Sequence, residues 1–264
     1  MKAALVYEET EAIRNQDFIN RLIGEASKHS ISMSLIRDGK DEIPEDVDFV
    51  FFRMRNPKRS QELEAKGYYL VNRSQVNVLA NDKWKSYQLA LLQNIPVVPT
   101  LLWKENTTLS FPCVVKSRYG YGGSDVFLLQ SSEDYQHLNI PFSFEEAIVQ
   151  PYIETNATDI RVFMIGEEVQ GAVKRQGKDS FKSNYLLGGS VETFSLASWQ
   201  IDHVTTLAKA IKSDYVGFDF LLLEDGTWLF NEMEDPVGAR SYYATTGIDI
   251  AVPIMEHIYT KLSK

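Results

Sequence analysis

The sequence predicts an α/β (α+β) protein in which a small parallel α/β unit precedes a larger, strand-rich part. Two patterns predict this class. Strand-like and helix-like segments alternate over roughly the first eighty residues, and short strands with glycine-containing turns dominate from Phe111 onward. The chain has 264 residues, of which 44% are hydrophobic and 24% charged. It therefore has the length for one to two domains and an ordinary globular composition.

The N-terminal unit is expected to contain parallel strands connected by helices. Apolar residues between Ile13 and Ala26 recur at the spacing of an amphipathic helix, and a later charged helix is expected to end with Gly67 as its C′ residue. The expected strands are Lys2 to Tyr7, Ile31 to Ile36, Asp48 to Phe52 and Tyr68 to Val71.

The remaining chain is expected to be mostly strands. Asp82 is a candidate N-cap for a helix through Asn94, and Pro96 and Pro99 require an extended segment after it. The expected strands are Cys113 to Lys116, Asp125 to Leu129, Ala147 to Ile153, Arg161 to Ile165, Val169 to Arg175, Tyr215 to Leu223 and Thr227 to Glu232. Helices are expected at about Ser132 to Leu138, Ile201 to Lys212 and Ile248 to Leu262.

Charge and cysteine content exclude several classes of partner and site. Lys and Arg total 27 and Asp and Glu total 36, which gives a net charge of −9. Because nucleic-acid backbones and anionic membranes are bound by clustered cations, neither is expected as the main partner. Cys113 is the one cysteine, so an intramolecular disulfide is impossible and a metal would need oxygen or nitrogen ligands.

No stretch of the sequence is long and apolar enough for a signal peptide or a membrane span. We therefore expect a cytoplasmic protein. Whether the protein forms a homo-oligomer stays an open question, because the sequence carries no coiled-coil or obvious interface signature.

The most informative local pattern is the acidic segment GFDFLLLEDGTWLFNEMED. Asp225-Gly226 is typical of a two-residue hairpin turn, and with that loop Asp219 faces Glu232 while Glu234 lies on the same side of the sheet. Like charges in opposition destabilise a sheet, so the three carboxylates need protons or a cation. A site for a hard cation such as Mg²⁺ is one interpretation. The other is a solvated sheet face balanced by Lys or Arg.

A second pattern, FPCVVKSRYGYGGSDVFLL, combines a lysine with glycines. Lys116 ends an apolar strand, and the loop that follows contains Gly120, Gly122, Gly123 and Ser124. Glycines let a backbone approach a polyphosphate closely while the lysine supplies charge. It is not a P-loop, since no GK[ST] follows and the next element is a strand. The alternative is an ordinary glycine-rich hairpin.

In this order, and on this strand-rich background, the two segments resemble the ATP-grasp superfamily and, within it, the RimK-like branch of carboxylate–amine ligases. The resemblance runs from about Asp82 to the C-terminal helix. It implies an ATP-grasp fold in three parts: a small N-terminal α/β (pre-ATP-grasp) domain over residues 1–80, a central lid subdomain with the glycine loop over 81–150, and a C-terminal subdomain with the metal site over 151–264. It also implies ATP and one or two Mg²⁺ ions as ligands.

The resemblance assigns nucleotide contacts to several residues. The phosphate lysines fall on Lys83 and Lys116, and Asp159 would meet the ribose. The adenine hinge falls on Gln150-Pro151-Tyr152-Ile153, where most relatives have an acidic residue in place of the proline. The carbonyl of that proline can still accept from the adenine amino group, while the backbone of Tyr152 or Ile153 offers the donor.

The resemblance also places cations near the transferring phosphate. Arg175 matches an arginine that would stabilise the transition state. The segment FKSNYLLGGS resembles the family's FRSN…GG, with Lys182 in place of arginine and Asn184 retained. The alternatives are a surface pair of Asp159 with Arg161, and solvated side chains for Arg175 and Lys182.

The metal motif departs from the family pattern. The family shows Asp and then Glu-x-Asn, whereas this chain has Asp219 and then Glu232-Met233-Glu234, so Glu234 stands at the asparagine position. A carboxylate can still bind Mg²⁺, and its extra charge should tighten metal binding while repelling phosphate. The hairpin geometry and the resemblance agree on Asp219, Glu232 and Glu234 as the metal ligands.

The resemblance implies an ATP-dependent ligase. ATP would convert a substrate carboxylate into an acyl phosphate, and an amine (or a thiol) would displace the phosphate. A small molecule, an amino acid or a peptide is the expected substrate. Two alternatives use the same residues: a small-molecule kinase, and an ATP-binding partner protein without turnover.

Three arginines are candidates for substrate binding. Arg240 follows the metal strand and is expected to bind a carboxylate, with Tyr242 and Tyr243 as pocket-lining or packing residues. Arg53 and Arg55 end the third N-terminal strand, where α/β folds often place ligand contacts. The alternative for this second pair is an ion pair with nearby acids.

Overall fold

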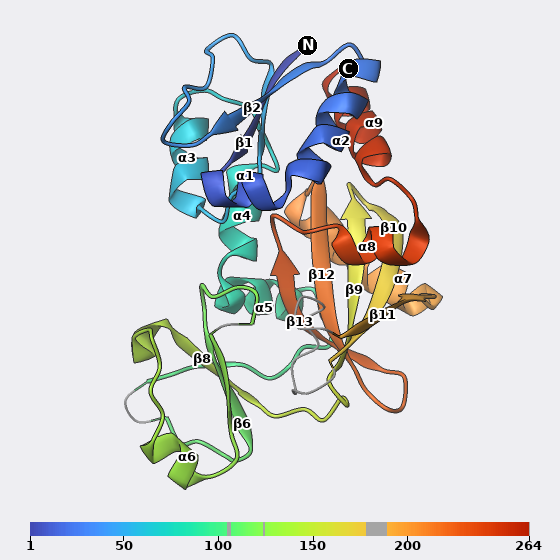
Figure 1. Cartoon of the computed structure of the whole chain (residues 1–264). Coiled ribbons are helices and arrows are strands. Elements are labelled where there is room, and N and C mark those ends of the chain that lie inside the picture. The colour runs from blue at the N-terminus through green and yellow to red at the C-terminus, as the bar shows by residue number, and fades with distance from the viewer. Residues whose placement is uncertain (105–106, 124, 178–188, 264) are drawn as a thin grey trace.

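The structure is a computed structural model that describes residues 1–104, 107–123, 125–177 and 189–263. Within these ranges the strands form one four-stranded parallel sheet and two antiparallel sheets, which succeed one another along the chain (Figure 1). This mixed architecture confirms the predicted α/β (α+β) class. No helix in these ranges has both the length and the apolar character needed to cross a membrane.

The N-terminal sheet is parallel, as predicted, with the order β2-β1-β3-β4. Its strands are β1 (Lys2–Tyr7), β2 (Ser32–Arg37), β3 (Phe49–Phe52) and β4 (Leu70–Val71). Its helices are α1 (Glu9–Arg14), α2 (Gln16–Lys28), α3 (Pro57–Ala65) and α4 (Ser74–Ala80). The prediction of a single helix around Ile13 to Ala26 is wrong, because Asn15 separates α1 from α2. Gly67 follows α3 with a φ of +96°, which confirms its predicted role in ending that helix.

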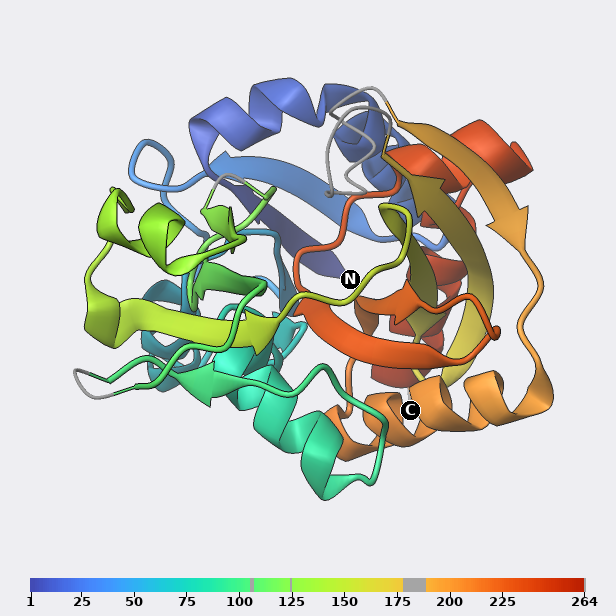
Figure 2. The ribbon, with the colours of Figure 1, turned by 90° about the horizontal axis from the view of Figure 1, so that it is seen from below.

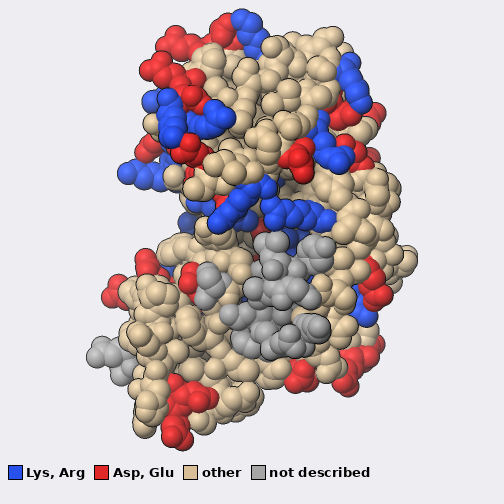
Figure 3. Space-filling model, in the orientation of Figure 1, with Lys and Arg blue, Asp and Glu red and all other residues tan. Residues whose placement is uncertain are grey.

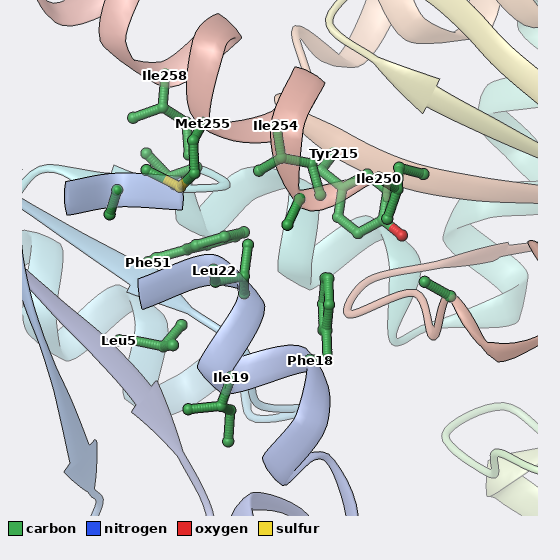
Figure 4. Packing of buried hydrophobic residues seen from close by; sticks show 14 of the residues in the cluster. Leu5, Phe18, Ile19, Leu22, Phe51, Tyr215, Ile250, Ile254, Met255 and Ile258 are labelled. Carbon is green, nitrogen blue, oxygen red and sulfur yellow. The ribbon is translucent and has the colours of Figure 1, made fainter. Parts of the chain in front are cut away.

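The core of the N-terminal sheet is completed by the last helix of the chain, α9 (Ala251–Leu262). Figure 4 shows Leu22 of α2, Phe51 of β3 and Met255 of α9 packed in one buried cluster. The boundary predicted at residue 80 thus falls between sheets, but not between separate cores.

The central sheet is antiparallel, with the order β5-β8-β6-β7. Its strands are β5 (Leu101–Leu102), β6 (Cys113–Ser117), β7 (Val126–Leu129) and β8 (Ala147–Pro151). The helices of this stretch of the chain are α5 (Lys83–Leu92), which packs against β13 of the C-terminal sheet, α6 (Ser132–Gln136) and the 3₁₀ helix η1 (Phe144–Glu146). Asp82 caps α5 as predicted, accepting hydrogen bonds from the backbone N–H groups of Trp84 and Lys85.

The C-terminal sheet is antiparallel, with the order β11-β10-β9-β12-β13. Its strands are β9 (Thr158–Ile165), β10 (Glu168–Gln176), β11 (Ser190–Phe194), β12 (Tyr215–Leu222) and β13 (Trp228–Glu234). The remaining helices are α7 (Ser198–Ile211) and α8 (Arg240–Thr246). Neither β11 nor α8 was expected, and α9 begins at Ala251 rather than Ile248. Seen from below in Figure 2, the central and C-terminal sheets lie on opposite sides of the molecule's middle.

Candidate active site

A cavity of about 770 Å³ is lined by residues from all three sheets and their connections. The predicted nucleotide, metal and transition-state residues that fall within the described ranges all line this cavity, and so do the three candidate substrate arginines. Three predicted residues, Ser124, Lys182 and Asn184, lie outside the described residues. Figure 3 shows Lys and Arg side chains gathered across the face where the upper lobe meets the lower part of the molecule.

The three predicted metal ligands meet at one wall of the cavity. One carboxylate oxygen from each of Asp219, Glu232 and Glu234 lies within 4.8 Å of the others. Asp219 faces Glu232 in the strand pairing, as predicted. A set of three carboxylates that converge in this way fits Mg²⁺, which prefers oxygen ligands.

The prediction of a two-residue loop in this hairpin is wrong. Leu223 N donates to Thr227 O, so the loop has three residues, Glu224 to Gly226. This shifts the pairing by one position, and a bulge at Asn231 shifts it back before Asp219. The two departures cancel, which leaves Asp219 opposite Glu232.

Two arginines surround the buried Asp219. Arg161 donates to both of its carboxylate oxygens at 2.7 and 2.6 Å, and Arg175 Nη2 donates to Oδ2 at 2.7 Å. Arg175 also holds both oxygens of Asp159, at 2.6 and 2.7 Å. Asp159 and Arg161 therefore do not form the surface pair considered above, and Arg175 is not a solvated side chain.

These arginines set the charge state of the acids. Burial alone would favour protonated Asp219, but Arg161 and Arg175 bring its pKa down to about 2. Burial likewise opposes ionisation of Glu234, whose pKa is nevertheless held below its ordinary value by Arg161 and Arg55. Both groups are therefore carboxylates at neutral pH, the form that binds a cation.

The two predicted phosphate lysines lie beside this cluster. Lys83 Nζ donates to Gly120 O and lies 3.4 Å from Glu232 Oε2. Lys116 Nζ donates to Asn231 Oδ1 at 2.9 Å. Burial lowers the pKa of Lys116 to about 8. Asn231 was not predicted, since its place in the bulge is what turns it toward the lysine.

The glycine loop is tied to the start of α5. Asp82 is buried and accepts from Arg118 Nη2 at 2.7 Å, while Lys83 N donates to Arg118 O at 3.0 Å. In the loop itself, Gly122 and Gly123 have φ values of +67° and +76°, which favour glycine. The N-cap aspartate thus also positions the loop, a second role that its sequence pattern did not indicate.

The predicted adenine hinge lies at the end of β8. Tyr152 N donates to Pro112 O at 3.1 Å, so Tyr152 is not the backbone donor for adenine. Ile153 N has no acceptor within the described ranges, which leaves it as the candidate donor. Cys113 and Pro151 form a non-hydrogen-bonded pair, so β6 does not use the Pro151 carbonyl. The contact of Asp159 with the ribose stays a prediction.

The candidate substrate arginines lie at the N-terminal side of the cavity. Arg53 is 4% exposed, donates to Val237 O at 2.6 Å, and its Nη1 has no hydrogen-bond partner in the described part of the chain. Arg240 Nη2 donates to Arg14 O at 2.8 Å. Arg55 contacts Glu234, which is the ion-pair alternative.

Tyr242 and Tyr243 do not line the cavity. Tyr242 packs edge-on against Phe163, and the Tyr243 hydroxyl donates to Asp249 Oδ1 at 3.1 Å. Both are packing residues of the unexpected helix α8.

Comparison with known proteins places this site in a family. Residues 80–258 match the RimK-like ATP-grasp domain. A Mycoplasma pneumoniae protein described as an uncharacterized MG011 homolog is 28% identical over 246 residues, covering 91% of this chain and 86% of the relative. A probable alpha-L-glutamate ligase of Haemophilus influenzae is 31% identical over 211 residues, covering 75% and 69%. The structure of D-alanine–D-alanine ligase from Bacillus anthracis superposes with a TM-score of 0.76 at 15% identity, covering 99% of this chain and 98% of that one. The fold is therefore ATP-grasp, and the chain belongs to the RimK-like ATP-grasp family of ligases.

Proposed function

We propose that the protein is an ATP-dependent carboxylate–amine ligase that activates a substrate carboxylate as an acyl phosphate and forms an amide or peptide bond. The observation that carries the proposal is the meeting of a three-carboxylate cluster with Lys83, Lys116 and Arg175 in one cavity. Cations beside a metal-ligating acid cluster suit a polyphosphate whose charge is shared between protein and metal.

Each group has a role in this chemistry. Asp219, Glu232 and Glu234 would hold Mg²⁺, which when bound supplies positive charge to the phosphates. Lys83 and Lys116 bind the phosphates, and the hinge 150–153 binds the adenine. Arg175 is held in place by Asp159 and Asp219, so it presents a fixed positive charge to the group being transferred.

The reaction proceeds in two displacements. An oxygen of the substrate carboxylate attacks the γ-phosphorus of ATP, ADP leaves, and the acyl phosphate forms. The amine then attacks the acyl carbon, inorganic phosphate leaves, and the amine loses one proton to give the amide. The cavity residues bind and orient the reactants, and the mechanism needs no nucleophilic side chain.

The substrate would lie at the N-terminal side, where Arg53 and Arg240 would bind a carboxylate. A guanidinium offers paired N–H donors that match two carboxylate oxygens. The Haemophilus influenzae relative is named a probable alpha-L-glutamate ligase, which makes amino acids and short peptides the substrates to test first.

The proposal is tested by measuring ADP release with Mg²⁺ and a panel of amino acids and short peptides, with and without hydroxylamine. A ligase gives ADP release that depends on the acid, together with hydroxamate, because hydroxylamine captures the acyl phosphate. A stable phosphorylated product without hydroxamate would show a kinase instead. Tight ATP binding without ADP release on any substrate would indicate a nucleotide-binding protein without turnover.

A further inference from the structure

Arg55 lies where the three parts of the molecule meet. It follows β3 in the N-terminal unit, and its Nη2 lies 3.3 Å from Oε2 of Glu234, the last residue of β13, and 3.3 Å from Pro236 O just after that strand. Its guanidinium carbon is 4.6 Å from the ring centroid of Tyr121 in the glycine loop. One side chain thus contacts the metal cluster and the phosphate loop from a third element.

The contact with Glu234 addresses an electrostatic problem. Three carboxylates crowded within 4.8 Å attract Mg²⁺ but repel the phosphates that must enter beside it. Asp219 has two guanidinium partners, Arg161 and Arg175. Glu234 shares Arg161 with Asp219, so Arg55 supplies the additional positive charge on this third carboxylate.

The Tyr121 ring helps to fix this charge. An arginine packed against an aromatic face gains a cation–π attraction and has fewer rotamers open to it. Its N–H groups then stay available in the guanidinium plane for Glu234 Oε2 and Pro236 O.

We infer that Arg55 is a positioning residue whose guanidinium offsets the charge of Glu234, so that an anionic nucleotide can bind beside a cluster of three carboxylates. The inference rests on the proposed function, because it takes a nucleotide and Mg²⁺ as the occupants of the cavity. It adds a role that the ligase reaction alone does not assign to this arginine.

Removal of Arg55 has effects of opposite sign on the two ligands. The uncompensated Glu234 repels free ADP more strongly, and it attracts free Mg²⁺ more strongly. If the Arg55 contacts only held the lobes together, their loss would lower the affinity for both ADP and Mg²⁺. The sign of the change therefore distinguishes charge compensation from a structural role.

The test is calorimetric titration of wild-type protein and Arg55→Gln with ADP in chelator, and separately with Mg²⁺ in the absence of nucleotide. We expect ADP to bind about fivefold more weakly and Mg²⁺ about threefold more tightly, modest changes because the Arg55 and Glu234 side chains keep 26% and 16% exposure. Adding Glu234→Gln to Arg55→Gln removes the charge that Arg55 offsets, so ADP affinity should return to within about twofold of wild type.

Arg59→Gln is a matched control. It breaks an arginine–carboxylate pair in the same lobe, with Asp38, at similar exposures of 27% and 19%, and neither residue lines the cavity. Both affinities should stay at wild-type values.

Two results would overturn the inference alone. In the first, the wild type binds ADP and Mg²⁺, and Arg55→Gln binds both of them more weakly. In the second, the ADP affinity of the double variant does not return to the wild-type value. A wild type that binds neither ADP nor Mg²⁺ would instead overturn the proposed function itself.

Discussion

Charged side chains at the two ends of the cavity differ in whether they have partners of opposite charge. At the metal end, Asp219 is shared by Arg161 and Arg175, and Glu234 by Arg161 and Arg55. At the N-terminal end, neither Arg53 nor Arg240 has a carboxylate within 4.0 Å in the described part of the chain.

The difference separates charges that are paired within the fold from charges that have no acid partner in the described residues. Arg53 is almost fully buried, and instead of an acid it meets the rings of Phe18, Phe51 and Tyr215 at 5.4 to 5.6 Å. Aromatic faces stabilise a cation in part, but an anion would do so more fully. The acids at the metal end thus have basic partners within the protein, while the two arginines at the N-terminal end have no acid partner in the described ranges and could take up the carboxylate of the proposed substrate.

The largest expected effect follows from the metal end. Glu232→Gln should reduce turnover by roughly a thousandfold or more, because it weakens a site whose charge the phosphoryl transfer requires. Its carboxylate contacts Lys83 and is 27% exposed, so the fold should remain intact. Steady-state ADP release and thermal unfolding measure the two quantities. Retained activity would contradict the metal assignment.

Asp219→Ala should affect stability as well as activity. It leaves Arg161 with Glu234 and Arg175 with Asp159, but removes the buried carboxylate between them, so the free energy of unfolding should fall by about 3 kcal/mol. Denaturant titration measures this loss.

Glu192→Ala provides the comparison for Asp219→Ala on the same sheet. It breaks an exposed pair with Lys174 and should cost about 1 kcal/mol or less. Equal losses in the two variants would show that the buried network is not what stabilises the metal end.

The sequence predicted this metal end better than it predicted the hairpin that forms it. Asp219 faces Glu232 because a three-residue loop and a bulge at Asn231 compensate for each other. A turn motif specifies local φ and ψ preferences, whereas a bulge depends on how the neighbouring strands pack. The face that carries the acids was therefore predictable, and the contact of Asn231 with Lys116 was not.

The acids that pair with the arginines could not be predicted from the sequence either. Arg161 was considered as a surface partner of Asp159, but it pairs with Asp219 on β12 and Glu234 on β13. Arg175 was expected near the transferring phosphate, and its partners Asp159 on β9 and Asp219 on β12 could not be read from spacing. Arg55 meets Glu234 from a position 179 residues away. Composition and spacing indicate which charges exist, while the sheet order decides which of them meet.

Arg53→Met should sharpen the contrast at the N-terminal end. The variant removes a buried charge that has no acid within 4.0 Å in the described residues and keeps a long apolar chain among the rings, so the free energy of unfolding should stay within about 1 kcal/mol of wild type. The KM for the acid substrate should rise about tenfold or more, because its carboxylate loses a guanidinium partner. An unchanged KM together with a large loss of stability would assign Arg53 to the fold instead.

The last expected effect is a pH dependence of nucleotide affinity from Lys116, whose pKa in the free protein is lowered to about 8 by burial. Bound phosphates favour the charged ammonium and raise this pKa in the complex, so binding above pH 8 requires uptake of a proton. ADP affinity should be flat below about pH 7.5 and should fall as pH rises through 8, by up to tenfold per unit. The phosphates, with a second pKa near 6, stay ionised over this range.

In Lys116→Arg the cation does not titrate, so calorimetry from pH 7 to 9.5 should show a flat profile. A wild-type profile that is equally flat would mean that Lys116 does not meet the phosphates, and that the balance of charge at the metal end is completed by other groups.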